Sequence, residues 1–144
     1  MTDIIKKYLS CPIFVCGAIF IISVTSLAMA LVAQYIFGLK PCILCIYQRI
    51  PFVITALAGL AGLIMSYSPD RMKIVAGLVF ISSLTFLAGG IIAAYHTGVE
   101  LHWWSSFLEG CTIEFGDGQD LLTMIESTQA ARCDEIPWAD PILG

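Results

Sequence analysis

Residues 11–39 read CPIFVCGAIFIISVTSLAMALVAQYIFGL, and this stretch contains no charged side chain. Two further uncharged runs follow, at 50–69 and 74–99. An α-helix rises about 1.5 Å per residue, so roughly 20 apolar residues cross a hydrocarbon core about 30 Å thick. Because backbone groups in lipid must be hydrogen-bonded within their own segment, we expect an all-α transmembrane helical bundle. The expected spans are residues 13–37, 45–67 and 74–95.

The overall composition supports a membrane protein. Of the 144 residues, 58% are hydrophobic and 12% are charged, against roughly 45–50% and 25% in soluble domains. These values exclude a disordered chain and a coiled coil, and they argue against a water-soluble globule. A net charge of -4 with only 7 Lys and Arg residues argues against binding to nucleic acid. We therefore expect residues 1–144 to form one membrane domain in contact with lipid.

The first apolar run also has features of a signal peptide. Lys6 and Lys7 precede it, and residues 28–30 read AMA, a small-x-small pattern typical of a cleavage site. The run continues past this point to Phe37, which favours a retained span. Under either interpretation the segment that follows lies outside the cytoplasm.

Basic residues favour a cytoplasmic N-terminus. Four of them would then be cytoplasmic and two near the helix ends would be outside. The cysteines support this orientation, because the four beyond the first span would lie outside the cytoplasm, where disulfides persist. The cytoplasmic set is Lys6, Lys7, Arg71 and Lys73, and the outer set is Lys40 and Arg49.

Two outer segments are expected, at 38–44 and 96–144. The second contains nine of the eleven acidic residues and only one basic residue, Arg132. Within it, residues 120–131 have an apolar face at helical spacing. This indicates a short amphipathic helix on the membrane surface or packed onto the rest of the outer segment. The three tryptophans suit the headgroup level, where this residue is enriched: Trp103, Trp104 and Trp138.

A C-x-x-C motif, Cys42 to Cys45, lies between the first two expected spans. Two thiols at this spacing can close a small disulfide ring, and the motif commonly lowers the pKa of one thiol. Arg49 follows four residues after Cys45 and would share its helix face, where a cation stabilises a thiolate. Pro51 weakens this argument if it lies in the first turn of the helix. Arg49 also fits a simple anchor at the helix end.

The remaining cysteines form two further groups. Cys111 and Cys133 lie in the outer segment and either staple a loop or relay oxidation to the first pair by thiol–disulfide exchange. Cys11 and Cys16 lie at the cytoplasmic end of the first span, and we interpret them as small buried residues.

His96 follows Tyr95 at the outer end of the third expected span, where it could bind a headgroup or move a proton. His96 also fits an ordinary polar residue at the membrane interface. The sequence gives no stronger argument for a functional role of His102. A zinc site would combine Cys42 and Cys45 with two of Cys111, Cys133, His96 and His102. Because no second closely spaced pair supports such a site, we expect no metal.

Residues 41–49, PCILCIYQR, resemble the signature of the DsbB family, the bacterial disulfide bond formation protein B. Residues 95–100, YHTGVE, resemble the third-helix exit of this family. Trp103-Trp104, Cys111-Thr112 and Cys133 resemble its second periplasmic loop. The likeness extends over nearly the whole chain.

The resemblance implies a membrane thiol–disulfide oxidoreductase in the bacterial inner membrane, with its redox cysteines on the periplasmic side. Such a protein reoxidises DsbA, a periplasmic thioredoxin-fold dithiol oxidase, and passes two electrons to a membrane quinone, either ubiquinone or menaquinone. On this chain, Cys42–Cys45 would be the quinone-linked pair, with Cys45 as the thiolate that contacts the ring. Cys111–Cys133 would be the pair that meets DsbA, with Cys111 forming the mixed disulfide.

The resemblance also implies that Arg49 lies beside the quinone and that His96 lies near it. The chemistry of these residues agrees, because reduction places negative charge on quinone oxygens, which a cation stabilises. The outer segment would have to move so that Cys111–Cys133 can meet both the partner and the first pair.

The chain departs from the family in one respect. The family has four transmembrane helices, and residues 141–144 of this chain fall where the fourth would begin. A fragment, a naturally short member and a helix supplied by another chain all fit this difference.

Two other kinds of protein also fit these residues. One is a non-catalytic membrane organiser or assembly subunit whose outer disulfides are structural, and the other is a metal-binding membrane protein.

Overall fold

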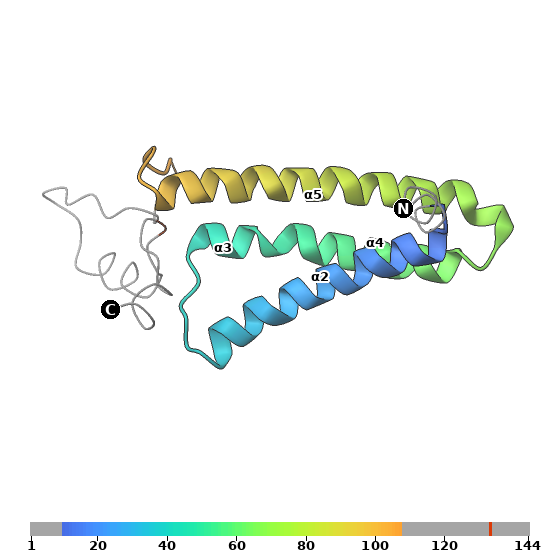
Figure 1. Cartoon of the computed structure of the whole chain (residues 1–144), viewed down its shortest axis with the longest axis horizontal. Coiled ribbons are helices and arrows are strands. Elements are labelled where there is room, and N and C mark those ends of the chain that lie inside the picture. Colours follow the sequence, from blue (N-terminus) through green and yellow to red (C-terminus); the bar gives the residue numbers. More distant parts are fainter. Residues whose placement is uncertain (1–9, 108–132, 134–144) are drawn as a thin grey trace, which may run out of the picture. The chain divides into compact units, whose positions relative to one another are not determined.

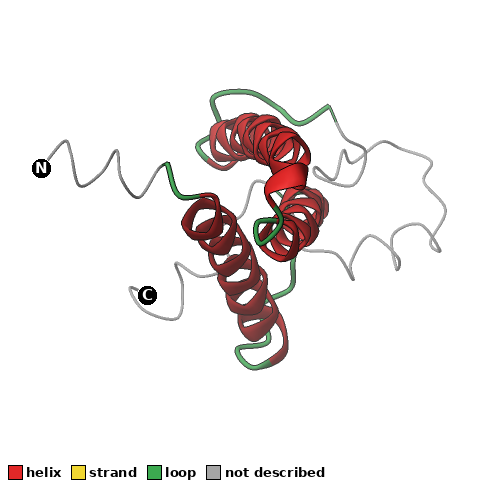
Figure 2. Ribbon diagram, turned by 90° about the vertical axis from the view of Figure 1, so that its right-hand side faces the viewer, coloured by secondary structure: helices red, strands yellow, loops and turns green. Residues whose placement is uncertain are grey.

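The computed structural model of the chain describes residues 10–107 and 133. The secondary structure of this part is helical, and no strand occurs among the described residues (Figure 2). The elements, labelled in Figure 1, are α2 (Pro12–Tyr35), α3 (Ile43–Tyr47), α4 (Arg49–Met65), the 3₁₀-helix η1 (Pro69–Arg71) and α5 (Met72–Glu100).

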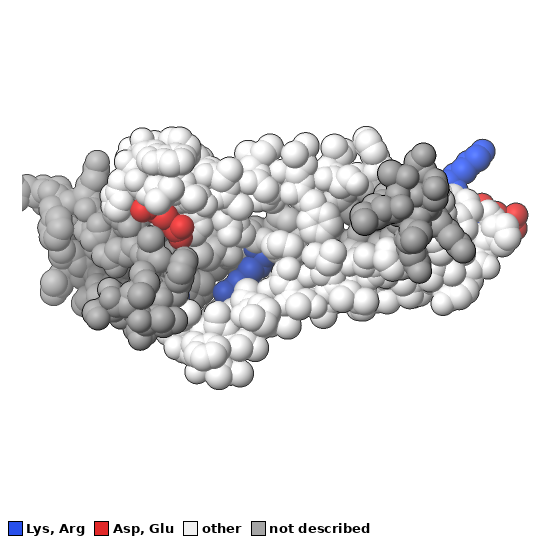
Figure 3. Space-filling view, viewed as in Figure 1, with Lys and Arg blue, Asp and Glu red and all other residues white. Residues whose placement is uncertain are grey.

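Three helical stretches are long and apolar enough to cross a membrane: Pro12–Tyr35, Ile43–Met65 and Pro69–Glu100. Many of their large apolar side chains are exposed, among them Ile21, Leu57 and Phe80. Helices that are apolar on all sides suit a lipid environment, and Figure 3 shows few charged side chains among the described residues. The predicted all-α, three-span class is confirmed. The amphipathic helix predicted at 120–131 lies outside the described residues.

The second span is interrupted at Gln48, which separates α3 from α4. The physical reason is Pro51, the third residue of α4. Proline has no N–H to donate to the carbonyl of residue 47, and its ring crowds that carbonyl. Pro51 thus lies in the first turn of α4, the position that weakens the shared-face argument for Cys45 and Arg49. Ile43–Met65 as a whole remains long and apolar enough to cross a membrane.

The described residues form two compact units, one from 10–30 and 49–90 and the other from 31–48, 91–107 and 133. In the first unit, α2 and α4 pack closely at Gly59, where an added Cβ would lie 2.8 Å from the backbone nitrogen of Phe20. Nearby, the buried hydroxyls of Ser23 and Thr55 form a hydrogen bond of 2.7 Å. A small residue at a close helix contact and a polar pair across it are typical of helix packing in membranes.

In the second unit, α5 continues to Glu100, five residues past the predicted end at 95. The helix closes with a C-terminal cap. The His102 N–H donates to the Val99 carbonyl at 3.1 Å, and the Trp103 N–H donates to the Gly98 carbonyl at 2.9 Å. His102 takes the left-handed conformation that this cap requires, with φ of 57°. His96 therefore lies within the helix, which holds its side chain at a defined place.

The contact at Gly59 predicts that Gly59→Ala destabilises the protein, because the neighbouring atoms belong to backbone and cannot move aside cheaply. We expect the free energy of unfolding in detergent to fall by about 1–3 kcal/mol, the usual cost of overpacking. Helicity followed by circular dichroism during denaturation measures this change.

Gly77→Ala is the matched control, because no atom lies within 4 Å of a Cβ added at this position near the start of α5. Both substitutions gain the same helix propensity. Equal stability of the two variants would contradict the close packing of α2 on α4.

Candidate functional site: a dithiol beside a histidine

The C-x-x-C motif forms the start of α3. Cys42 is the N-cap residue, with extended backbone at φ −74° and ψ 168°, and its Sγ accepts a hydrogen bond from the Cys45 backbone N–H at 3.3 Å. Cysteine here takes the place of the Ser, Thr, Asp or Asn residues usual at this position. The cap turns the Cys42 side chain back over the first turn of α3, towards Cys45.

The two sulfur atoms lie 2.9 Å apart, and the Cys42 thiol donates a hydrogen bond to the Cys45 sulfur. Both residues are free thiols in the structure. A disulfide bond is about 2.05 Å long, so only a small movement separates this dithiol from its oxidised form. Cys42 is buried and Cys45 is half-buried, which leaves Cys45 as the more accessible sulfur.

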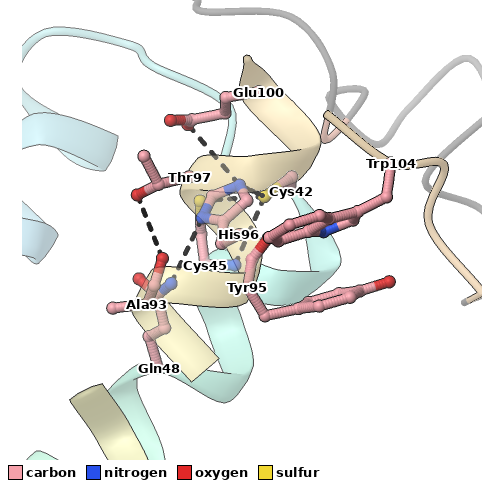
Figure 4. A network of polar contacts seen from close by, with 9 residues as sticks. All are labelled: Cys42, Cys45, Gln48, Ala93, Tyr95, His96, Thr97, Glu100 and Trp104. Carbon is pink, nitrogen blue, oxygen red and sulfur yellow. Dashed lines mark hydrogen bonds and ion pairs between the residues drawn. The ribbon is translucent and has the colours of Figure 1, made fainter. Parts of the chain in front are cut away.

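His96 reaches this pair from α5 (Figure 4). Its Nε2 atom lies 3.4 Å from the Cys42 Sγ and 3.5 Å from the Glu100 Oε1, and its Nδ1 lies 3.2 Å from the Gln48 Nε2. His96 is 7% exposed. The predicted pair and the predicted histidine therefore meet in one buried cluster.

Gln48 sets the proton position on His96. With the amide oriented as in the structure, its nitrogen can only donate, so Nδ1 is the acceptor. In the neutral ring the proton then lies on Nε2, facing the Cys42 sulfur and the Glu100 carboxylate. In this arrangement the Nε2–H of His96 can donate a hydrogen bond to the Cys42 sulfur, and the Glu100 carboxylate lies beside the same ring nitrogen.

Sequence reasoning assigned no role to Gln48 or Glu100. The available signals were spacings alone, because Gln48 follows Cys45 by three residues and Glu100 follows His96 by four. Such pairs share a helix face, and the His96–Glu100 contact within α5 has this i, i+4 spacing. The contact of Gln48 with His96 is long-range, and no spacing along the chain indicates it.

Apolar groups surround the sulfur of Cys42. Cys42, Leu44, Val99 and Cys133 form one buried cluster, with Tyr95 packed against it. Cys133 is fully buried and disulfide-bonded. The structure thus brings a cysteine of the second predicted pair next to the first pair, although Cys111 lies outside the described residues.

Aromatic side chains pack beyond Tyr95. Its ring stacks on Trp104 with centroids 6.1 Å apart, and the Trp104 indole N–H donates to the Tyr95 carbonyl at 3.2 Å. The Tyr95 hydroxyl accepts a hydrogen bond from the Phe107 backbone N–H at 3.2 Å. Gly98 is required here, because an added Cβ would overlap the indole of Trp104. These contacts hold the segment after α5 against the helix that carries His96.

The remaining predicted residues lie elsewhere. Arg49 is the first residue of α4 and belongs to the first compact unit, so its role stays a prediction. His102 is exposed and caps α5 through its backbone. Cys16 is buried as expected, but Cys11 is exposed, because it precedes the first turn of α2 and has little packed around it.

The family model described as "Disulfide bond formation protein DsbB" matches residues 13–141. The chain belongs to the DsbB family. Its three helical stretches that are long and apolar enough to cross a membrane agree with a multi-pass membrane protein.

Several curated relatives carry the name disulfide bond formation protein B. The one from Neisseria gonorrhoeae is 40% identical over 78 residues, which cover 54% of this chain and 46% of the relative. The one from Salmonella typhimurium is 38% identical over 90 residues, which cover 60% of this chain and 48% of the relative. The matched part of the chain thus spans about half the length of these DsbB relatives. No solved structure matches this chain significantly.

The hydrogen bonds of the pair predict how Cys42 titrates. Its pKa is raised above the ordinary value because its thiol donates to the Cys45 sulfur and because it is buried. Cys45→Ala removes the acceptor, so the pKa of Cys42 should fall while burial still holds it up. Since the thiolate is the reactive form, the alkylation rate of Cys42 should move to lower pH, by about one pH unit for one hydrogen bond.

The measurement is iodoacetamide labelling of reduced protein over a pH series, with Cys42 followed by mass spectrometry. Cys11→Ala is the control, because Cys11 is exposed and belongs to the first compact unit. If the pH dependence of Cys42 alkylation were the same in Cys45→Ala as in the unchanged protein, the sulfur–sulfur hydrogen bond would not be what raises the pKa of Cys42.

Proposed function

We propose that this protein reoxidises a periplasmic thioredoxin-fold dithiol oxidase of the DsbA type and passes the electrons through Cys42–Cys45 to a membrane quinone. The observation that carries this proposal is the dithiol at the start of a membrane-capable helix, with His96 on one side and Cys133 in the same buried cluster. The same proposal places the chain in the bacterial inner membrane, with these cysteines on the periplasmic side.

Two disulfide exchanges and one oxidation complete the cycle. A partner dithiol reduces the Cys111–Cys133 disulfide through a mixed disulfide at Cys111, and the partner leaves oxidised. The Cys111–Cys133 dithiol then reduces the Cys42–Cys45 disulfide. The cluster of Cys42 with Cys133 supports this second exchange, because one cysteine of each pair belongs to the same buried apolar cluster.

The last step reoxidises Cys42–Cys45, and a quinone supplies the capacity to accept two electrons and two protons. The residues present suit an apolar acceptor. Cys45 is half-buried, and the next two residues of α3, Ile46 and Tyr47, expose apolar surface. Cys45 is the attacking thiolate in this scheme, and Cys42 closes the disulfide.

His96 and Arg49 have separate tasks in the proposal. The Nε2 of His96 lies 3.4 Å from the Cys42 sulfur, so its N–H can donate a hydrogen bond that stabilises negative charge on this sulfur as the disulfide closes. Arg49 supplies a fixed positive charge for the negative charge that develops on an acceptor oxygen. A permanent structural staple would require none of these side chains.

Quinone reduction by the purified protein tests the proposal. With a reduced DsbA-type partner and a ubiquinone analogue in detergent, the absorbance of the quinone should fall with turnover, and Cys45→Ser should abolish it. Cys11→Ser should retain the full rate. The assay should be repeated on the chain extended by a fourth helix. Failure of both proteins would move the assignment to a membrane organiser with structural disulfides.

Arg49→Ala tests the proposed charge. We expect the rate of quinone reduction to fall by roughly tenfold or more, the lower end of what loss of a charge-stabilising group costs, with thermal stability nearly unchanged. Arg71→Ala is the matched control, because Arg71 lies in η1, at the turn between α4 and α5. Equal rates for the two variants would remove Arg49 from the acceptor site.

A further inference from the structure

Cys42, Cys45 and His96 also form a set of metal-ligating side chains. The two Sγ atoms and a ring nitrogen all lie within 4.8 Å of one another, and no other group of this kind occurs in the part of the chain that the structure describes. Thiolate sulfur and imidazole nitrogen are the donors that zinc prefers. The sequence alone did not support a metal site, because it contains no second closely spaced pair of metal-ligating residues.

We propose that the reduced Cys42–Cys45 pair and His96 bind one zinc-type divalent cation, and that the bound cation blocks reoxidation of the pair. This inference goes beyond the proposed electron transfer. It requires only that the two cysteines be reduced.

The distances fit a tetrahedral ion. Zinc binds sulfur at about 2.3 Å and nitrogen at about 2.0–2.1 Å, which places neighbouring ligands about 3.4–3.8 Å apart. The Cys42 Sγ and His96 Nε2 are already 3.4 Å apart. The two sulfurs are 2.9 Å apart, so they need to move apart by less than about 1 Å to reach the spacing of neighbouring zinc ligands. Three protein ligands leave the fourth position to water.

The groups around the ligands suit a bound cation. A zinc-bound histidine donates its other ring N–H to an acceptor, and Gln48 lies 3.2 Å from Nδ1. By turning its amide, Gln48 can present oxygen in place of nitrogen. The Cys45 N–H already donates to the Cys42 sulfur, and the carboxylate of Glu100, 3.5 Å from Nε2, adds negative charge beside the cation.

Binding distinguishes the two oxidation states of the pair. The dithiol releases two protons and forms two metal–sulfur bonds, whereas the disulfide has no thiolate to offer. Closing the disulfide uses electron pairs of the same two sulfurs, so the cation must leave before the pair can be oxidised. A bound cation therefore holds the pair in its reduced form.

Cobalt(II) alone is the first probe, because it replaces zinc and its bonds to thiolate absorb visibly. We expect purified protein in detergent, reduced with a phosphine, to bind one Co²⁺ per chain with a thiolate-to-metal absorption band. Zn²⁺ should displace it, and protein with its disulfides intact should show no band. The double variant Cys111→Ser, Cys133→Ser should retain the site, since neither residue is a proposed ligand.

His96→Ala should weaken Co²⁺ binding by about tenfold or more, because a lost ligand costs at least as much as a lost partner of a ligand. His102→Ala, which changes the exposed histidine at the end of α5, should bind as the unchanged protein does. In the unchanged protein, Zn²⁺ should also protect Cys42 and Cys45 from maleimide while leaving Cys11 reactive.

Three results would overturn the proposal. They are the absence of a thiolate band in reduced protein, equal binding by His96→Ala and His102→Ala, and reaction of Cys42 and Cys45 with maleimide in the presence of Zn²⁺. All of these measurements omit the quinone and the protein partner. A failure of electron transfer and a failure of metal binding are therefore distinguishable.

Discussion

The hydrogen bond from the Cys45 backbone N–H to the Cys42 sulfur is the contact on which the site depends. It makes Cys42 the cap of α3 and folds its side chain back over the first turn, so that the two sulfurs lie 2.9 Å apart. A cysteine in an extended strand or in the middle of a helix would point its sulfur elsewhere. With the sulfurs in place, His96 needs only to reach one of them, and it lies 3.4 Å from Cys42.

The helices supply this site with the rigidity that an irregular loop lacks. Pro51 interrupts the second span at Gln48, and the side chain of Gln48 bonds the ring of His96. At the end of α5, the cap at His102 and the stack of Tyr95 on Trp104 fix the turn after the helix. Each of these contacts acts on His96 or on Tyr95, which packs against the buried cluster of Cys42. Together they define the positions of the side chains around the dithiol.

The same arrangement allows the dithiol two competing reactions, oxidation to a disulfide and binding of a metal ion. Two sulfurs close together can form a disulfide when an acceptor removes two electrons, and two thiolates beside an imidazole can bind a soft cation. Both processes use the same electron pairs and therefore exclude each other. Under the two proposals, reoxidation of the pair and binding of a zinc-type cation therefore compete for the same reduced dithiol.

The sequence by itself determined the fold class and the family. Long uncharged runs permit only helices in lipid, and a C-x-x-C motif with its flanking residues carries the family signature, because both depend on neighbours along the chain. The i, i+4 spacing within α5 already allows the contact of His96 with Glu100. The tertiary structure alone decided that His96 meets Cys42, that Gln48 bonds the ring of His96 and that Cys133 packs on the first pair. These contacts join residues on different elements, and local spacing holds no information about the face that one element turns towards another.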